Sequence, residues 1–169
     1  MGAILTEDDL AAAVARDRAA GRTIAFANGC FDIFHVGHVR YLQGAAAEAN
    51  RLIVAVNDDE SVTKLKGPGR PVMPAADRAE IVAAVAAVDY VVVFADPNVE
   101  RLLMRLRPDV HCKGTDYTVD TVPERAVVEA YGGRTAIVGD AKRHASRDLI
   151  RSLRDQRPTT NDQRLTTND

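Results

Sequence analysis

The stretch Asn28-Gly29-Cys30-Phe31-Asp32-Ile33-Phe34-His35-Val36-Gly37-His38 decides the fold of this chain. The apolar run Thr23-Ile24-Ala25-Phe26-Ala27 precedes it, and a segment with a helical pattern, residues 38–49, follows it. A short apolar run bounded by turn residues is typical of a strand that is buried on both faces. Strand, glycine-containing loop and helix in this order indicate an α/β protein with a parallel sheet.

The same alternation of strand and helix continues along the chain. Strands are expected at residues 23–27, 52–56, 90–94, 110–113 and 135–138, and helices at 7–20, 38–49, 75–87, from 97, at 123–131 and at 146–154. The alternation predicts a Rossmann-like, doubly wound, parallel five-stranded sheet with helices on both faces. Glycines and prolines predict an irregular loop over 58–74. Because such sheets bind ligands beyond the carboxyl ends of their strands, we expect functional loops after Ala27, Val56 and Lys113.

Length and composition bound the organisation of the chain. It has 169 residues, of which 46% are hydrophobic and 27% charged, as in ordinary soluble globular proteins. We expect a single domain over residues 1–156. Residues 157–169 are polar and contain the tetrapeptide Thr-Thr-Asn-Asp twice, which predicts a disordered tail.

Composition also argues against several classes of partner. A net charge of −2 gives no positive field for nucleic acid, and 5% aromatic residues without Trp offer few platforms for stacking bases. No apolar run approaches the roughly 20 residues that span a bilayer, so no membrane contact is expected. The N-terminus lacks a basic-then-apolar signal pattern, which predicts a cytoplasmic protein. Cys30 and Cys112 form no CxxC pair, so neither a redox motif nor a thiolate zinc site is indicated.

The segment from Asn28 to His38 has the features of a phosphate-binding loop. Backbone N–H groups at the start of a helix attract anions, and Gly29 and Gly37 let the backbone approach a ligand closely. His35 and His38 are three residues apart, so both imidazoles can lie on one side of the helix start. There they can donate hydrogen bonds to phosphate oxygens and stabilise charge that develops at phosphorus.

Other interpretations of this loop stay open. The two histidines could hold a metal ion together with Cys30 or Asp32, although helical zinc motifs more often space histidines four apart. They could also be purely structural. Phe31 is typical of a core residue, Cys30 of a small buried hydrophobe, and Asp32 of a residue that orients the loop or a histidine.

Gly29-x-Phe31-Asp32-x-x-His35-x-Gly37-His38 resembles the GxFDxxHxGH signature of the cytidylyltransferase-like superfamily, which is long and specific. The resemblance implies a Rossmann-like fold and transfer of a nucleotidyl group to a phosphorylated alcohol, sugar or vitamin. It assigns contact with the triphosphate and stabilisation of the transition state to His35 and His38. The residues that it implies around the nucleotide are Asn28, Gly29, Cys30, Phe31, Asp32 and Gly37.

A basic loop follows the second predicted strand. The stretch Lys64-Leu65-Lys66-Gly67-Pro68-Gly69-Arg70-Pro71-Val72-Met73-Pro74 carries three cations among glycines and prolines. Such a loop can clamp a triphosphate and an acceptor phosphate, because arginine makes bidentate contacts and lysine supplies a point charge. A solvated basic loop without a ligand is the alternative.

This loop and two further stretches narrow the resemblance. KxKGxxRPVxPxxxR at 64–78, VDxVV at 88–92 and PDxxxKGxDY at 108–117 look like stretches of bacterial heptose 1-phosphate adenylyltransferases. Those enzymes occur alone or as half of a bifunctional heptose kinase/adenylyltransferase, and their product, ADP-heptose, is a lipopolysaccharide precursor. The resemblance covers about residues 23–153 and implies transfer of AMP from ATP to a heptose 1-phosphate.

The narrower resemblance also implies roles for single residues. Lys66 would touch the triphosphate and share in catalysis with the two histidines. Lys113 would lie on the nucleotide side, and Arg70, Asp116 and Tyr117 around the sugar substrate. For Lys113, a strand-end lysine in solvent is the alternative.

One segment departs from the pattern of those enzymes. They usually carry a run of serine and threonine before the last helix, where hydroxyls contact the nucleotide phosphates, whereas this chain reads Ala145-Ser146-Arg147. Ser146 and Arg147 are expected to contact the nucleotide, with a plain helix-capping role for Ser146 as the alternative. The departure leaves a cytidylyl or guanylyl donor open.

The chemistry implied by the resemblance is an in-line attack of the sugar phosphate on the α-phosphorus, with pyrophosphate as the leaving group. Mg²⁺ is expected with the triphosphate, and the sequence names no protein ligands for it. Other acceptors of the superfamily (glycerol 3-phosphate, FMN, a pantetheine phosphate) and a non-catalytic nucleotide-binding module remain alternatives. The alanine-rich helix at 75–87 is compatible with a homodimer.

Overall fold

The computed structural model describes residues 1–140 and residue 150. Ser146 and Arg147 lie outside the described residues, as do the predicted tail and nearly all of the predicted last helix. Among the described residues, no helix is both long and apolar enough to cross a bilayer.

A parallel sheet forms the centre of the described part of the chain, with strand order β1-β4-β3-β2-β5-β6. Its strands are β1 (Ala3–Ile4), β2 (Ile24–Gly29), β3 (Arg51–Asn57), β4 (Tyr90–Phe94), β5 (Val110–Gly114) and β6 (Arg134–Val138). The Rossmann-like α/β prediction is confirmed, but five strands is one too few. The additional strand, β1, pairs with the edge of β4 over two residues and is too short to leave a periodic pattern.

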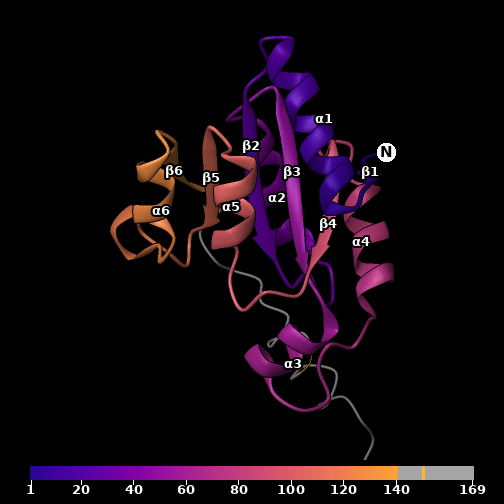
Figure 1. The fold of residues 1–169 in the computed structure, drawn as a ribbon. Helices are drawn as coiled ribbons and strands as arrows, with labels where there is room; N and C mark the ends of the chain where they lie inside the picture. The colour runs from indigo at the N-terminus through magenta and orange to yellow at the C-terminus, as the bar shows by residue number, and fades with distance from the viewer. Residues whose placement is uncertain (141–149, 151–169) are drawn as a thin grey trace, which may run out of the picture.

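Helices cover both faces of the sheet (Figure 1). They are α1 (Glu7–Ala19), α2 (Val36–Ala46), α3 (Asp59–Lys66), α4 (Ala75–Ala83), α5 (Glu100–Leu106), α6 (Arg125–Ala130) and the short 3₁₀ helix η1 (Val119–Thr121). One core lies between the sheet and α1, α5 and α6, and a second lies between the sheet and α2 and α4. Strand residues alternate between the two cores, as expected of a sheet buried on both faces.

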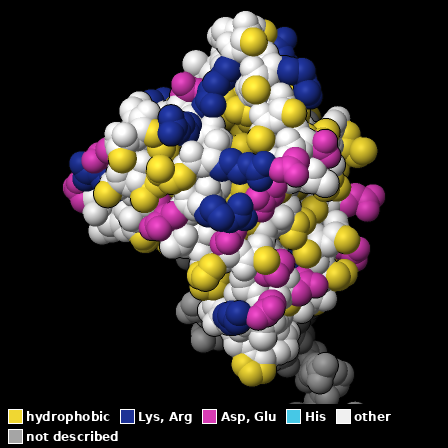
Figure 2. Space-filling view, in the orientation of Figure 1, with side chains coloured by type: hydrophobic (Ala, Val, Ile, Leu, Met, Phe, Trp, Pro, Cys, Tyr) yellow, Lys and Arg dark blue, Asp and Glu magenta, His cyan; other side chains and the backbone are white. Residues whose placement is uncertain are grey.

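The outer face over α1 and α5 carries charges of both signs (Figure 2). Arg101 bonds Glu7 at 2.7 Å and Asp96 at 2.6 Å, and Arg105 pairs with Asp8. Paired charges of this kind form no single-sign field on this face.

Helix α3 corrects the prediction of an irregular loop over 58–74. Asp58 caps the helix by accepting a 2.8 Å hydrogen bond from the N–H of Ser61, acids occupy the first turn and lysines the last. The helix ends at Gly67, whose φ of 90° needs a glycine. The capping signal is present in the sequence, but the glycines and prolines begin only at residue 67.

The strand order reverses at β2, which lies between β3 and β5. A ligand crevice is expected at such a switch point, beyond the carboxyl ends of the strands. Helix α3 and the loop that follows it lie beyond these carboxyl ends (Figure 1). The fold therefore gathers the loop after β2, the loop 67–74 and the end of β5 in one region.

Candidate active site

The loop between β2 and α2 has a strained backbone. Phe31 and Ile33 have φ of 50° and 59°, in the left-handed region that non-glycine residues rarely adopt. Such strain persists where the surroundings impose it, and it concentrates at functional sites. The Phe31 ring is buried and lies edge-on to the ring of His38, with centroids 5.3 Å apart. A Cβ on Gly29 would meet that ring at 3.2 Å, so Gly29 makes room for it.

The Phe31 ring thus packs against the ring of His38, and the Phe31 side chain belongs to the core, as the core interpretation predicts. Any nucleotide contact by Phe31 would use its backbone.

His35 and His38 are held together at the start of α2. His35 is the N-cap residue, and its Nδ1 accepts a 3.1 Å hydrogen bond from the N–H of Gly37. Nδ1 of His38 lies 3.4 Å from the N–H of His35, and the two rings stack with centroids 3.9 Å apart. Because both Nδ1 atoms act as acceptors, each neutral ring carries its proton on Nε2. The pair therefore offers two Nε2–H donors, while the Gly37 N–H is already engaged.

Burial, followed by the neighbouring His35 and Lys66, lowers the pKa of His38 to about 3. Lys66 is the last residue of α3 and is exposed. Because Lys66 contributes to the lowered pKa of His38, its ammonium group lies close enough to act on the histidine pair.

Cys30 is half-buried rather than fully buried, and burial raises the pKa of its thiol despite the opposing effect of Lys66 and Arg78. A thiol in this state is a poor nucleophile. The thiol donates to Oδ1 of Asn57, at a distance of 3.9 Å.

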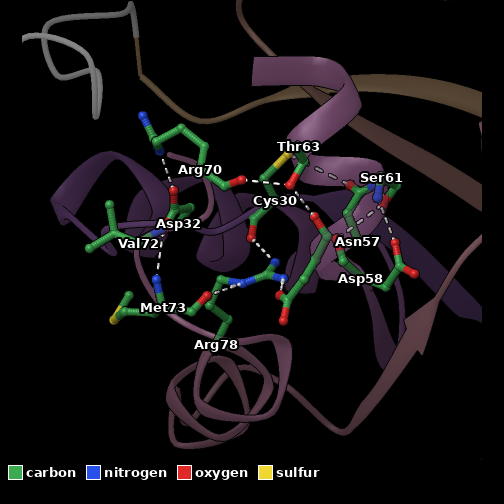
Figure 3. A network of polar contacts seen from close by, with 11 residues as sticks. Cys30, Asp32, Asn57, Asp58, Ser61, Thr63, Arg70, Val72, Met73 and Arg78 are labelled. Carbon is green, nitrogen blue, oxygen red and sulfur yellow. Dashed lines mark hydrogen bonds and ion pairs between the residues drawn. The ribbon is translucent and has the colours of Figure 1, made fainter. Parts of the chain in front are cut away.

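Asp32 ties the first loop to the loop 67–74 (Figure 3). Its buried carboxylate accepts hydrogen bonds from Nε of Arg70 at 2.5 Å and from the N–H groups of Val72 at 2.9 Å and Met73 at 3.3 Å. Burial alone would raise the pKa of Asp32, but these hydrogen bonds outweigh it and hold the pKa below its usual value. Asp32 therefore orients the loop. Nη2 of Arg70 is buried and has no hydrogen-bond partner among the described residues, which leaves a donor for a ligand.

Arg78, at the end of the KxKGxxRPVxPxxxR stretch, received no role from the sequence. The residue is fully buried in α4 and donates to the carbonyl oxygens of Cys30 at 2.5 Å and Met73 at 3.0 Å. It also bonds the carboxylate of Asp59 at 2.7 Å, at the start of α3. One guanidinium thus fixes three segments of the site, and its place at the end of the basic stretch is the signal that could have found it.

Lys113 lies at the switch point and is 7% exposed, so the alternative of a solvated strand-end lysine is wrong. Its Nζ lies 3.1 Å from Oδ1 of Asn28 and 3.2 Å from the buried carboxylate of Glu124. His111 Nε2 lies 3.2 Å from the same Asn28 oxygen. Glu124 received no role from the sequence, because an acid next to Pro123 looks like an ordinary first-turn residue of a helix.

Asp116 and Tyr117 are exposed in the loop after β5. The Tyr117 ring lies 5.4 Å from Nζ of Lys113, so the structure brings this predicted substrate residue next to the switch point. The side chain of Asp116 lies in the same loop.

No group of three or more His, Cys, Asp or Glu side chains that could hold a metal ion occurs in the described residues. Asp32, one of the two further ligands that the metal-site alternative named, is engaged by Arg70 and the backbone. The described side chains around the loops are suited to phosphate rather than to direct metal ligation.

Two histidines with lowered pKa values, the buried His111 and the half-buried His38, predict that acid destabilises the protein. Burial, with a smaller effect of Lys113, lowers the pKa of His111 to about 3, and the pKa of His38 is also about 3. The usual value is 6.5, so below it the unfolded chain binds more protons than the folded chain, and stability falls as the pH falls from 6.5 towards 3. Each histidine contributes a slope of up to about 1.4 kcal/mol per pH unit.

Urea unfolding between about pH 6 and pH 4.5, above the range where most carboxylates titrate, measures this slope. His111→Gln removes one titrating group and keeps a donor for Asn28, so we expect the slope to decrease by up to about 1.4 kcal/mol per pH unit. An unchanged slope would show that His111 does not titrate between the two states.

The cytidylyltransferase-like family profile matches residues 26–163. The chain is 45% identical over 153 residues to the bifunctional protein HldE of Ectopseudomonas mendocina and to that of Azotobacter vinelandii, covering 90% of this chain and 32% of each relative. It is 44% identical to HldE of Pseudomonas fluorescens. The chain thus spans about a third of the length of these relatives.

The fold is also similar to a solved structure. The crystal structure of the lipopolysaccharide core biosynthesis protein from Thermoplasma volcanium superposes with a TM-score of 0.62 and 21% identity, covering 72% of this chain and 100% of that one. At this identity the likeness shows the fold alone. With the profile match over most of its length, the chain belongs to the cytidylyltransferase-like family.

Proposed function

We propose that this chain is a nucleotidyltransferase that transfers AMP from ATP to a heptose 1-phosphate and releases pyrophosphate. The observation that carries the proposal is the stacked pair His35 and His38 at the start of α2, whose Nδ1 atoms both accept from backbone N–H groups, so that each neutral ring carries an Nε2–H donor. Lys66 adds positive charge at the end of α3, and Nη2 of Arg70, which has no hydrogen-bond partner among the described residues, adds a donor on the neighbouring loop. The heptose assignment rests on the three stretches at 64–78, 88–92 and 108–117 and is supported by the 45% identity to HldE proteins.

The reaction needs no activated side chain. An oxygen of the sugar phosphate is already an anion; it forms a bond to the α-phosphorus while the bond from that phosphorus to the pyrophosphate oxygen breaks on the opposite side. His35, His38 and Lys66 would donate to the phosphate oxygens as charge builds up, and Arg70, held by Asp32, would bind an acceptor phosphate. When bound, Mg²⁺ supplies neutralisation of the triphosphate charge, and it would be held by phosphate oxygens and water.

The product identifies the substrates directly. Purified chain is incubated with Mg²⁺, heptose 1-phosphate and one of ATP, CTP, GTP or UTP, and nucleotide sugars are detected by mass spectrometry. We expect ADP-heptose as the main product. A heptose product with a different nucleotide would change only the assigned nucleotide. Product formation with glycerol 3-phosphate, FMN or a pantetheine phosphate instead of heptose 1-phosphate would overturn the heptose assignment.

Lys66 and Lys64 provide a matched pair on α3. Lys64 is exposed and pairs with Glu60 at 2.6 Å, whereas Lys66 influences His38. Loss of a hydrogen bond to a charged group costs about 1.5–3 kcal/mol, so we expect Lys66→Met to lower kcat/KM roughly 10- to 100-fold. Lys64→Met should stay within about twofold, since exposed ion pairs contribute little. Equal effects of the two variants would show that Lys66 has no special role.

A further inference from the structure

The switch point holds a polar cluster that the proposed reaction does not yet use. In the register of β2 and β5, Phe26 lies opposite His111 and Ala27 lies opposite Cys112, so Asn28 and Lys113 come next along the two strands. Because side chains alternate along a strand, Asn28, His111 and Lys113 share the face covered by α5 and α6. The register of the sheet thus assembles the cluster.

The contacts fix the orientation of the Asn28 amide. An ammonium group only donates, so the Asn28 atom 3.1 Å from Lys113 Nζ is the amide oxygen. The same oxygen lies 3.2 Å from His111 Nε2, and the buried neutral imidazole must carry its proton there to make this bond. Two donors therefore occupy the oxygen. The amide NH₂ group has no hydrogen-bond partner in the described ranges and remains available as a donor at the carboxyl end of β2.

Glu124 balances the charge of this cluster. Its carboxylate is 6% exposed and lies 3.2 Å from Nζ of Lys113. Burial lowers the pKa of Lys113, and Glu124 opposes that effect and favours the ammonium form. The ion pair is neutral as a whole, unlike the exposed cation Lys66 at the end of α3. The cluster thus offers a hydrogen bond without a net charge, which suits an uncharged acceptor better than a phosphate.

We propose that Glu124 is a positioning residue that holds Lys113 against Asn28, so that the Asn28 amide donates to an uncharged oxygen or nitrogen of one substrate. That acceptor belongs to the nucleobase and ribose or to the hydroxyls of the sugar. The inference rests on the proposed function to the extent that a nucleotide and a sugar phosphate bind at this switch point. The inference adds Glu124 to that function, as a residue that affects the affinity for one ligand without contacting either ligand.

The test measures the binding of each ligand alone by calorimetry, with Mg-ATP in one arm and heptose 1-phosphate in the other. Glu124→Gln and Asn28→Ala should each lower the affinity for the same one of the two ligands roughly tenfold, as expected for the loss of one hydrogen bond. The affinity for the other ligand should stay unchanged. The double variant should lose little more than either single variant, because both changes act on one contact. Glu124→Asp should recover part of the loss.

Glu129→Gln is the matched control, since Glu129 pairs at 2.7 Å with the exposed Arg125 on the same helix. It should change neither affinity. If Glu124→Gln fails to fold, Lys113→Met/Glu124→Gln removes both charges at similar volume and should show the same selective loss. Unchanged affinities, or equal weakening of both ligands, would overturn the inference. Binding needs no turnover, so a wild-type chain that binds both ligands without releasing pyrophosphate would contradict the proposed reaction alone.

Discussion

Replacing His38 by alanine lowers turnover about 10²- to 10³-fold while the chain stays folded. The stacked ring offers an Nε2–H donor held in place before the substrate arrives, because its Nδ1 accepts from the backbone of His35. Removal of one such preorganised donor typically costs about 2.7–4 kcal/mol of transition-state stabilisation. Steady-state kinetics measure the loss, and thermal unfolding shows whether the fold persists.

His35 has a second role that must be separated from catalysis. It caps α2 through a 3.1 Å hydrogen bond from Gly37, so His35→Ala also loses about 0.5–2 kcal/mol of stability. Asparagine is a good N-cap residue, so His35→Asn should keep most of this stability but lose turnover as His35→Ala does. If His35→Asn and His38→Ala both turn over at nearly the wild-type rate, the histidines have no catalytic role.

Replacing Asp32 by alanine destabilises the protein by about 3–5 kcal/mol, because it leaves the Arg70 guanidinium without its buried counter-ion. The N–H groups of Val72 and Met73 lose their acceptor as well. Asp32→Asn keeps one acceptor oxygen, so it should lower the free energy of unfolding by less than Asp32→Ala does. Urea unfolding gives the free-energy differences, provided that the slope with denaturant stays the same.

Asp120 provides the control for this prediction. It also pairs with an arginine, Arg125, but the side chain of Asp120 is 85% exposed. Asp120→Ala should therefore change stability by no more than about 1 kcal/mol. Losses of equal size at the two positions would mean that Asp32 does not fasten the loop 67–74.

The parts of the fold that depend on apolar patterns could be predicted from the sequence. The strands β2, β3 and β4 are built on continuous apolar runs, and β5 and β6 contain shorter ones. The structure has all five strands within one or two residues of their predicted positions. Helix α3 was not predicted because its residues are mostly polar and its clearest signal is the capping residue Asp58. The two residues of β1 form a strand only through the edge of β4, a tertiary effect that a local pattern does not carry.

In the candidate site, too, local features could be predicted from the sequence, whereas contacts between distant segments could not. The loop from Asn28 to His38 is local, so its spacing was enough to predict that the two histidines lie together. The prediction that the helix N-terminus supplies free N–H groups was wrong for Gly37, since the N-cap role of His35 depends on its side-chain rotamer. The links of Arg78 to Cys30 and of Lys113 to Glu124 join segments that are distant in sequence, and only the folded chain brings them together.

Pyrophosphate release tests the central claim most directly. Purified chain with Mg²⁺ and ATP is assayed in the presence and in the absence of heptose 1-phosphate. We expect pyrophosphate to be released only when both substrates are present, in amounts equal to the ADP-heptose formed. Binding of ATP without release, or release that does not depend on the sugar phosphate, would contradict this claim.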